Sequence, residues 1–103
     1  MMVVLFSATL AEDADTAAYE ALDKHLYGIV GSMPGFLSVK EYTAADGETI
    51  GVVRFESEEA LEAWRRQPDH QEAQRRGREE FYARYDIEVL RLERASRFER
   101  PQA

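Results

Sequence analysis

His70 is the residue of this sequence best suited to carry a proton near neutral pH. The chain has two histidines, and imidazole is the side chain whose unperturbed pKa, about 6.5, lies closest to neutrality. Trp64, the single tryptophan, stands six residues before His70. Between them Pro68 ends one helix and Asp69 can cap the next, so both side chains should lie near a bend in the backbone. The pair predicts a small pocket in which an imidazole faces an aromatic wall.

Such a pocket suits a flat, phenol-like or quinol-like ligand whose phenolic proton His70 would accept. Tyr82 or Tyr85 could add a hydroxyl donor. The electron-rich anion that results can react directly with dioxygen, so this chemistry needs neither a metal nor a flavin, and we expect no cofactor. The alternative is a structural role, because Trp64, three residues after Leu61, fits a core position and His70 fits a helix cap.

His25 is the second candidate for the pocket. It lies at the edge of the apolar stripe of the first predicted helix, where a half-buried structural histidine is the more common outcome. Two histidines so far apart make no HExxH-type metal motif, and the adjacent pairs Glu58-Glu59 and Glu79-Glu80 diverge on a helix. The chain has no cysteine, which excludes thiol nucleophiles and thiolate metal sites. We therefore expect no metal site.

The charge of the chain argues against nucleic acid as a partner. The sequence has 20 acidic and 13 basic residues and a net charge of −7, which repels phosphate backbones. No Gly-rich phosphate loop and no GxSxG elbow is present, which excludes the usual nucleotide and hydrolase sites. No apolar run approaches the length that spans a bilayer, and the start MMVVLFSATL lacks the basic segment and cleavage site of a secretion signal. We expect a cytoplasmic protein with no membrane partner.

The elements that would position these residues alternate between strands and helices. Apolar and β-branched runs predict strands, and apolar residues spaced by three and four predict helices. Asp46-Gly47 suits a tight hairpin turn, Ser57 can cap a helix, and Asp69 with Glu72 forms a capping box for another. The expected strands are residues 2–10, 36–43, 49–56 and 86–98, and the expected helices are residues 15–32, 57–67 and 69–82.

This order of elements, β-α-β-β-α-β, is that of the ferredoxin-like α+β fold. Its four strands form an antiparallel sheet with the helices on one face. We expect a single domain over residues 1–98, followed by a loose tail at 99–103.

The predicted sheet has apolar residues on the face that the helices leave uncovered. In the first strand Val3 and Leu5 point away from the side on which Phe6 lies. The uncovered face predicts a homodimer that stacks sheet on sheet, although isolated exposed apolar residues are common in monomers. A change of phase between Val89 and Leu90 predicts a β-bulge in the last strand.

The chain as a whole resembles the antibiotic biosynthesis monooxygenase domain family, whose members are dimeric α+β barrels built from ferredoxin-like subunits. Members include cofactor-independent oxygenases of polyketide phenols or quinols, a signalling-molecule isomerase and haem-degrading enzymes. The segments that carry the resemblance are VVLFSATL in the first strand, MPGF at 33–36, VVRFESEEALEAW at 52–64, QPDH at 67–70 and IEVLRLERASRF in the last strand.

The resemblance also implies positions in the pocket. His70 matches a histidine that follows a proline after the second helix, and Trp64 matches the aromatic position at the end of EALEAW. An ungapped carry-over places Arg84 at a basic pocket position. Phe6 or Ser7 stands where haem-degrading members use an asparagine on the first strand.

Two positions depart from the patterns of the better-defined branches. Gln74 stands where haem-degrading members carry a histidine ligand, so haem breakdown is disfavoured. Ala60 stands where polyketide-oxidising members carry an asparagine, so their reaction cannot be transferred unchanged, because a shared fold does not imply a shared chemistry.

We therefore expect a small homodimeric oxygenase that oxidises an aromatic, quinol-type molecule without metal or flavin. The expected proton acceptor is His70, and the expected substrate-binding residues are Trp64, Tyr82, Arg84, Phe6 and His25. The alternative is a non-catalytic dimer that binds a small hydrophobic metabolite, and haem binding is a third, disfavoured hypothesis.

Overall fold

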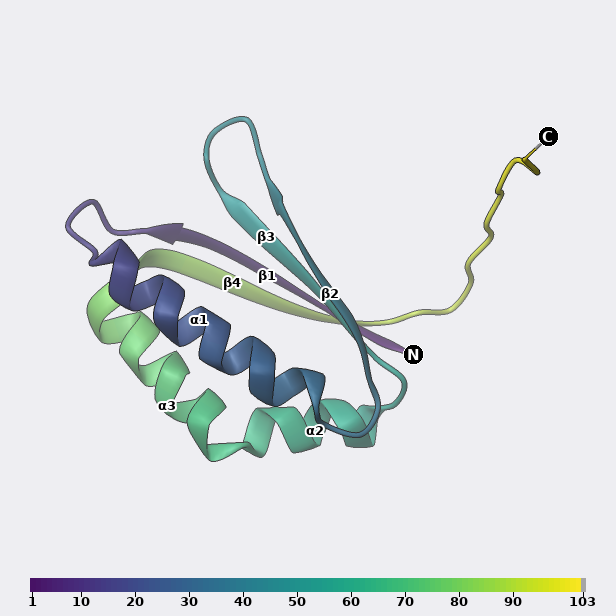
Figure 1. Ribbon diagram of the computed structural model, residues 1–103, viewed down its shortest axis with the longest axis horizontal. Coiled ribbons are helices and arrows are strands. Elements are labelled where there is room, and N and C mark those ends of the chain that lie inside the picture. Colours follow the sequence, from purple (N-terminus) through teal and green to yellow (C-terminus); the bar gives the residue numbers. More distant parts are fainter. Residues whose placement is uncertain (103) are drawn as a thin grey trace.

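The computed structural model describes residues 1–102. Its four strands form one antiparallel sheet in the order β2-β3-β1-β4, and the helices gather on one side of that sheet (Figure 1). The expected ferredoxin-like α+β fold is therefore confirmed. In chain order the elements are β1 (Met2–Leu10), α1 (Thr16–Gly31), β2 (Phe36–Thr43), β3 (Thr49–Phe55), α2 (Glu58–Arg66), α3 (Pro68–Arg76), a π-helical turn (Gly77–Phe81) and β4 (Tyr82–Arg91).

Side-chain caps begin the first two helices, and the Ser57 cap lies where the sequence predicts it. The Asp15 carboxylate accepts a hydrogen bond from the Ala18 backbone N–H at 3.0 Å, and the Ser57 hydroxyl accepts one from the Ala60 backbone N–H at 3.1 Å. Each cap satisfies a backbone donor that the first turn of a helix leaves free. The caps thereby fix where α1 and α2 begin, and with it the face that each turns toward the sheet.

The start of α3 differs from the expectation, because Asp69 does not cap this helix. The Gln67 side-chain oxygen accepts the hydrogen bond from the His70 backbone N–H at 2.8 Å, and Pro68 occupies the first turn. Proline fits there because its fixed φ angle is helical and its missing N–H would have no helical partner. Gln67 also ends α2, so the two helices meet at one residue and the backbone of His70 is held at the bend.

The last strand also differs from the expectation, which placed it at residues 86–98. β4 begins at Tyr82 and ends at Arg91, and a π-helical turn replaces the last turn of the predicted helix. This turn needs Gly77, since a Cβ atom there would lie 2.5 Å from the Tyr82 ring. Because the helix ends early, Tyr82 pairs with Leu10 of β1 and joins the sheet.

The register shift between β1 and β4 lies between Thr9 and Leu10, so the bulge predicted between Val89 and Leu90 is wrong. No change of phase is required there, because the two residues point to opposite faces and both are exposed, at 51% and 44%.

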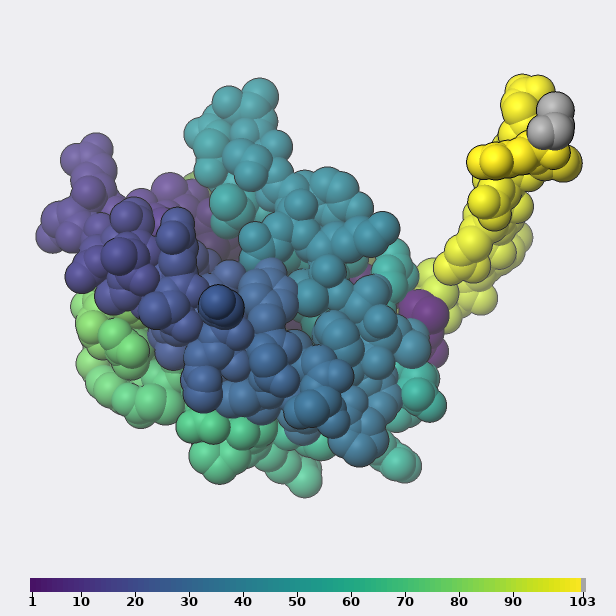
Figure 2. All heavy atoms as spheres, viewed as in Figure 1, coloured from purple at the N-terminus to yellow at the C-terminus, as the bar shows by residue number. Residues whose placement is uncertain are grey.

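Beyond Arg91 the chain up to residue 102 has no helix or strand. In Figure 2 this segment stands clear of the rest of the molecule.

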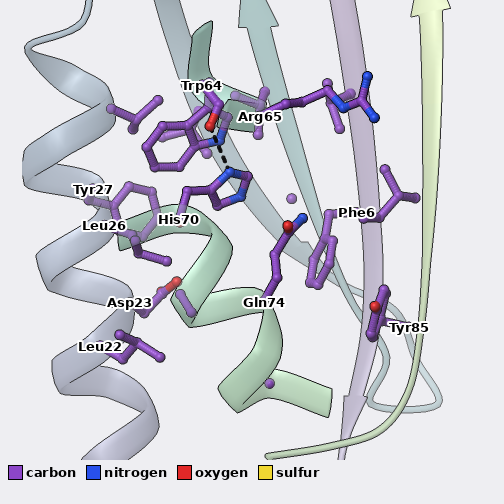
Figure 3. Close-up of a pocket in the computed structure, with 18 of the residues that line it drawn as sticks. Phe6, Leu22, Asp23, Leu26, Tyr27, Trp64, Arg65, His70, Gln74 and Tyr85 are labelled. Carbon is purple, nitrogen blue, oxygen red and sulfur yellow. Dashed lines mark hydrogen bonds between the residues drawn. The ribbon is translucent and has the colours of Figure 1, made fainter. Parts of the chain in front are cut away.

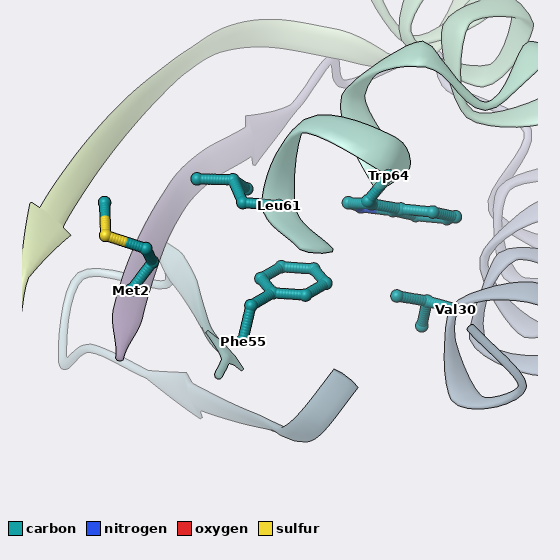
Figure 4. Packing of buried hydrophobic residues seen from close by; sticks show 5 residues of the cluster. All are labelled: Met2, Val30, Phe55, Leu61 and Trp64. Carbon is teal, nitrogen blue, oxygen red and sulfur yellow. The ribbon is translucent and has the colours of Figure 1, made fainter. Parts of the chain in front are cut away.

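An apolar core holds the helices on the sheet. Phe55, 1% exposed, is its most deeply buried large side chain, and Figure 4 shows it among the other members of the cluster, Met2, Val30, Leu61 and Trp64. Trp64 is 9% exposed. The structural role considered for the tryptophan is therefore present, and the site below shows that a pocket role is compatible with it.

Two glycines with positive φ angles allow a direct test of packing at the turn before β2. Gly35 (φ 85°) has the Ala60 Cβ atom 2.5 Å from where its own Cβ would lie, whereas Gly47 (φ 93°) has no atom within 4 Å of that point. Both positions disfavour a side chain by about 1 kcal/mol through backbone strain alone. Gly35→Ala should lose a further 1–3 kcal/mol or so to the clash with α2. Urea unfolding of the two variants checks this, and equal losses would contradict the role of the close approach.

Candidate functional site

A cavity of about 230 Å³ lies between the sheet and the three helices. Every strand and every α-helix contributes to its lining. Figure 3 shows His70 and Trp64 on one side of the space and Phe6 and Tyr85 on the other. Most of the lining side chains are apolar or aromatic, which is the usual composition of a small-molecule site.

His70 is fixed against Trp64 by two contacts. The two rings stack with their centroids 4.0 Å apart and their planes 14° from parallel. The His70 Nδ1 atom lies 3.0 Å from the Trp64 carbonyl oxygen. A carbonyl only accepts hydrogen bonds, so Nδ1 carries the proton and donates it, and Nε2 is left with a free lone pair. The geometry therefore holds the imidazole in the form that can accept a proton at Nε2.

The surroundings of His70 keep its ring neutral. Burial lowers the pKa of His70 below its usual value, and the hydrogen bond to the Trp64 carbonyl opposes this only in part. A neutral imidazole at neutral pH is the species that acts as a base.

The opposite wall of the cavity is aromatic. The Phe6 ring stacks on the Tyr85 ring, with centroids 5.5 Å apart and planes at 23°, and the Tyr82 ring meets both of them edge-on at 5.5 and 5.6 Å. The Tyr82 hydroxyl donates a hydrogen bond to the Tyr19 hydroxyl at 3.2 Å. Between this wall and His70, the amide of Gln74 points into the space (Figure 3).

The structure brings together four of the six residues expected in the site. His70, Trp64, Tyr82 and Phe6 all line the cavity. The other two expected residues do not line it. His25 is exposed on α1, because its side chain points away from the stripe that faces the sheet. Arg84 is exposed on β4, and its guanidinium donates a hydrogen bond to the Glu48 carboxylate at 3.3 Å.

Sequence analysis missed a polar group at the edge of the cavity. Asp23 of α1 and Glu41 of β2 both line it, and the hydroxyl of Tyr27 donates a hydrogen bond to the Glu41 carboxylate. Burial, and to a smaller extent the charge of Glu41, raise the pKa of Asp23 to about 6. The spacing of Tyr19, Asp23 and Tyr27, four residues apart, could have revealed that they share one helix face.

Ionised Asp23 should destabilise the folded protein. Its pKa rises from 3.8 unfolded to about 6 folded, so the native state holds the proton more tightly, and stability falls as pH rises from about 4 to above 6. Asp23→Asn should abolish that fall and raise the free energy of unfolding at pH 7.5 by about 1 kcal/mol, after allowance for solvent screening of a half-buried group. Denaturant unfolding at pH 4.5 and 7.5 measures the effect. An Asp23→Asn variant that is less stable at pH 7.5 would contradict it.

Within residues 1–102 no helix is long and apolar enough to cross a membrane. In the same part of the chain no three His, Asp or Glu side chains lie close enough together to hold a metal ion.

Comparison with known proteins gives a family match over most of the chain. The family model described as "Antibiotic biosynthesis monooxygenase" matches residues 1–76. The protein YqjZ of Bacillus subtilis (strain 168), which is uncharacterized, is 32% identical over 96 residues, which cover 93% of this chain and 82% of YqjZ.

Solved structures share the fold. Rv0793 from Mycobacterium tuberculosis is 26% identical with a TM-score of 0.76, and the match covers 92% of this chain and 98% of Rv0793. SnoaB, a cofactor-independent oxygenase from Streptomyces nogalater, is 11% identical with a TM-score of 0.73, covering 91% and 94% of the two chains. A protein from Deinococcus radiodurans is 12% identical with a TM-score of 0.81, covering 96% and 99%. The last two likenesses concern the fold alone.

Proposed function

Because the chain belongs to the antibiotic biosynthesis monooxygenase family, we propose that it is a small oxygenase that oxidises an aromatic, quinol-type molecule with dioxygen, without metal or flavin. The observation that carries the proposal is the His70 ring, held by Trp64 with Nε2 free, in a cavity whose far wall is the Phe6–Tyr85 stack. Such a space can hold a planar ring with its ionisable group at His70. The cofactor-independent oxygenase SnoaB shares this fold, which supports the same class of reaction.

The reaction balances with dioxygen as the only co-reactant. For an anthrone, His70 Nε2 removes a proton from the substrate and leaves an electron-rich anion. The anion passes one electron to dioxygen, and the two radicals combine to form a C–O bond. The peroxide anion that results takes the proton back from His70 and becomes a hydroperoxide. Neutral His70 then removes the second C–H proton while the O–O bond breaks, which turns the CH2 carbon into a carbonyl. The second oxygen leaves as hydroxide, takes that second proton from His70 and becomes water. One CH2 group and one O2 thus give one C=O and one H2O.

Oxygen uptake tests this function. Purified, chelator-treated protein is offered a panel of anthrones and hydroquinones in air, and we expect multiple turnovers on at least one compound, with one atom of labelled dioxygen in the product carbonyl. Heat-denatured protein supplies the background. Oxygen uptake no faster than that background, across the panel, would contradict the proposal.

A non-catalytic binder is the second candidate, favoured by Gln74 and Ala60, which stand where the better-defined branches of the family carry a haem-ligating histidine and an asparagine. The melting temperature of a binder should rise when a ligand is added, and that ligand should be recovered unchanged. Multiple turnovers on that ligand would exclude it.

We also propose that two copies pair through the sheet face opposite the helices. Leu5 lies on that face, because its neighbours Val4 and Phe6 line the cavity, and it pairs across the sheet with Val52 of β3. Leu90 of β4 is 44% exposed there. Pairing would hide this apolar surface from water.

Leu5→Glu should convert the dimer into a monomer, because a carboxylate would be buried in the interface without a partner. Sedimentation velocity measures the change. Val89→Glu places the same charge on the opposite face of the sheet and should leave the dimer intact. A wild-type protein that sediments as a monomer would contradict the pairing.

A further inference from the structure

Asp23 and Glu41 stand where the cavity meets a second hollow. Both residues line the main cavity, and both also line an adjoining space of about 310 Å³, together with Tyr19 and Tyr82. A ligand that extends from His70 toward this second space passes the two carboxylates. They belong to the proposed site, at the end that the His70 chemistry leaves unused.

The charge of these carboxylates is not balanced within the cavity. Among the described residues, no ion pair involves Asp23 or Glu41. Arg65 is the one guanidinium in the lining, and it is held by Glu62 at 2.7 Å. His70 is kept neutral by burial, which lowers its pKa. The interior is therefore negative at the Asp23 end, where burial and, to a smaller extent, the charge of Glu41 raise the pKa of Asp23.

Aromatic rings surround the same end. Tyr19 and Tyr82 meet edge-on with centroids 5.7 Å apart, and Tyr27 donates its hydroxyl hydrogen bond to Glu41. Ring faces attract cations, and the attraction grows where water is excluded. Carboxylates without counter-ions, which accept hydrogen bonds, suit an ammonium group when they lie beside tyrosine rings. The same residues repel a carboxylate or phosphate, because a like charge would enter a partly desolvated space.

We infer that the ligand of this cavity is a phenol or quinol that carries a protonated amine, and that Asp23 is the residue that selects it. The inference rests on the proposed function for the site and adds the substrate class. The phenolic end lies at His70, between Trp64 and the Phe6–Tyr85 wall. The ammonium end lies at Asp23 and Glu41. An equivalent ligand with a carboxylate in place of the amine is disfavoured by charge.

Three phenols of matched shape test the selection. Tyramine carries an ammonium group, 4-ethylphenol is neutral, and 3-(4-hydroxyphenyl)propionate carries a carboxylate on the same two-carbon spacer. Binding to the whole protein is measured by titration calorimetry at pH 7.5, without oxygen, so that no turnover interferes. We expect tyramine to bind about tenfold or more tighter than the propionate, with the neutral phenol between them.

Matched variants assign the selection to the cavity rather than to the net charge of −7. Asp23→Asn keeps the shape and should reduce the ratio of tyramine to propionate affinity to about threefold, while Glu41→Gln should reduce it in part. Glu20→Gln removes the same charge from an exposed position of α1 that does not line the cavity, and should leave the ratio unchanged. Circular dichroism confirms that each variant is folded.

Several results would overturn the inference. The propionate could bind as tightly as tyramine, Glu20→Gln could change the ratio as much as Asp23→Asn, or none of the three phenols could bind. The proposed reaction can fail independently of the inference. If the protein selects tyramine but takes up no oxygen with any phenol or quinol, including those that carry a protonated amine, it binds amines without oxidising them. If the protein takes up oxygen with uncharged quinols but does not prefer amines, the proposed oxygenase function stands and the inferred substrate class is wrong.

Discussion

His70→Ala should lower kcat/KM for an oxidisable quinol or anthrone by about 100-fold or more. General-base catalysis by a positioned side chain contributes about 10²- to 10⁴-fold, and His70 is the one imidazole in the cavity lining, with Nε2 free. The matched control is His25→Ala. His25 is exposed and outside the cavity, so its loss should leave kcat/KM unchanged within about twofold, the scatter expected of a surface substitution.

The pH dependence of the wild-type rate distinguishes a base from a merely structural histidine. Burial lowers the pKa of His70 below 6.5, so the ring is neutral above that pH and becomes protonated as pH falls further. The rate should be flat from pH 7 to 8 and should fall below pH 6.5. An acid limb that persists in His70→Ala, or equal losses in the two histidine variants, would contradict the assignment.

Phe55→Ala should lower the free energy of unfolding by about 3–5 kcal/mol, the usual cost of deleting a buried aromatic ring. Phe55 is 1% exposed and packs with Trp64 and Leu61 where α2 meets the sheet. Because single domains of this size are stable by only about 5–15 kcal/mol, this one change should remove a large share of the stability. The Trp64–His70 stack depends on α2, so ligand binding should weaken as well.

Leu37→Ala is the control for this change. Leu37 is 46% exposed, and its truncation should cost within about 0.5 kcal/mol. Urea unfolding followed by circular dichroism measures both variants. Similar losses at the two positions would contradict the placement of the core at Phe55.

Hydrophobic period and turn chemistry were sufficient to predict most of the fold. The strand at the start of the chain, the hairpin at Asp46-Gly47 and the Ser57 cap depend on neighbouring residues, and such local signals can be read directly. The start of α3 and the ends of β4 could not be predicted, because they depend on distant contacts. Gly77 ends the helix early because the Tyr82 ring occupies the space beside it.

The candidate site was predictable only where rare residue types marked it. Trp64 and His70 stand out because each is rare in the sequence, and the stack between them is the observed geometry. Asp23 and Glu41 are two among many acidic residues, and only the packing of α1 against β2 brings them to one cavity. Arg84 was placed by an ungapped carry-over, and β4 directs it to solvent, toward Glu48.

The most direct test of the central claim is an anaerobic incubation of the protein with an anthrone in deuterated buffer. Without dioxygen the proposed reaction stops after reversible proton transfer to His70, so the wild-type protein should speed the exchange of the anthrone CH2 protons for deuterium at neutral pH, which NMR follows. His70→Ala should leave the exchange at the rate of the buffer alone. Exchange that the wild-type protein does not speed, or that His70→Ala speeds equally, would contradict the assignment of His70 as the proton acceptor.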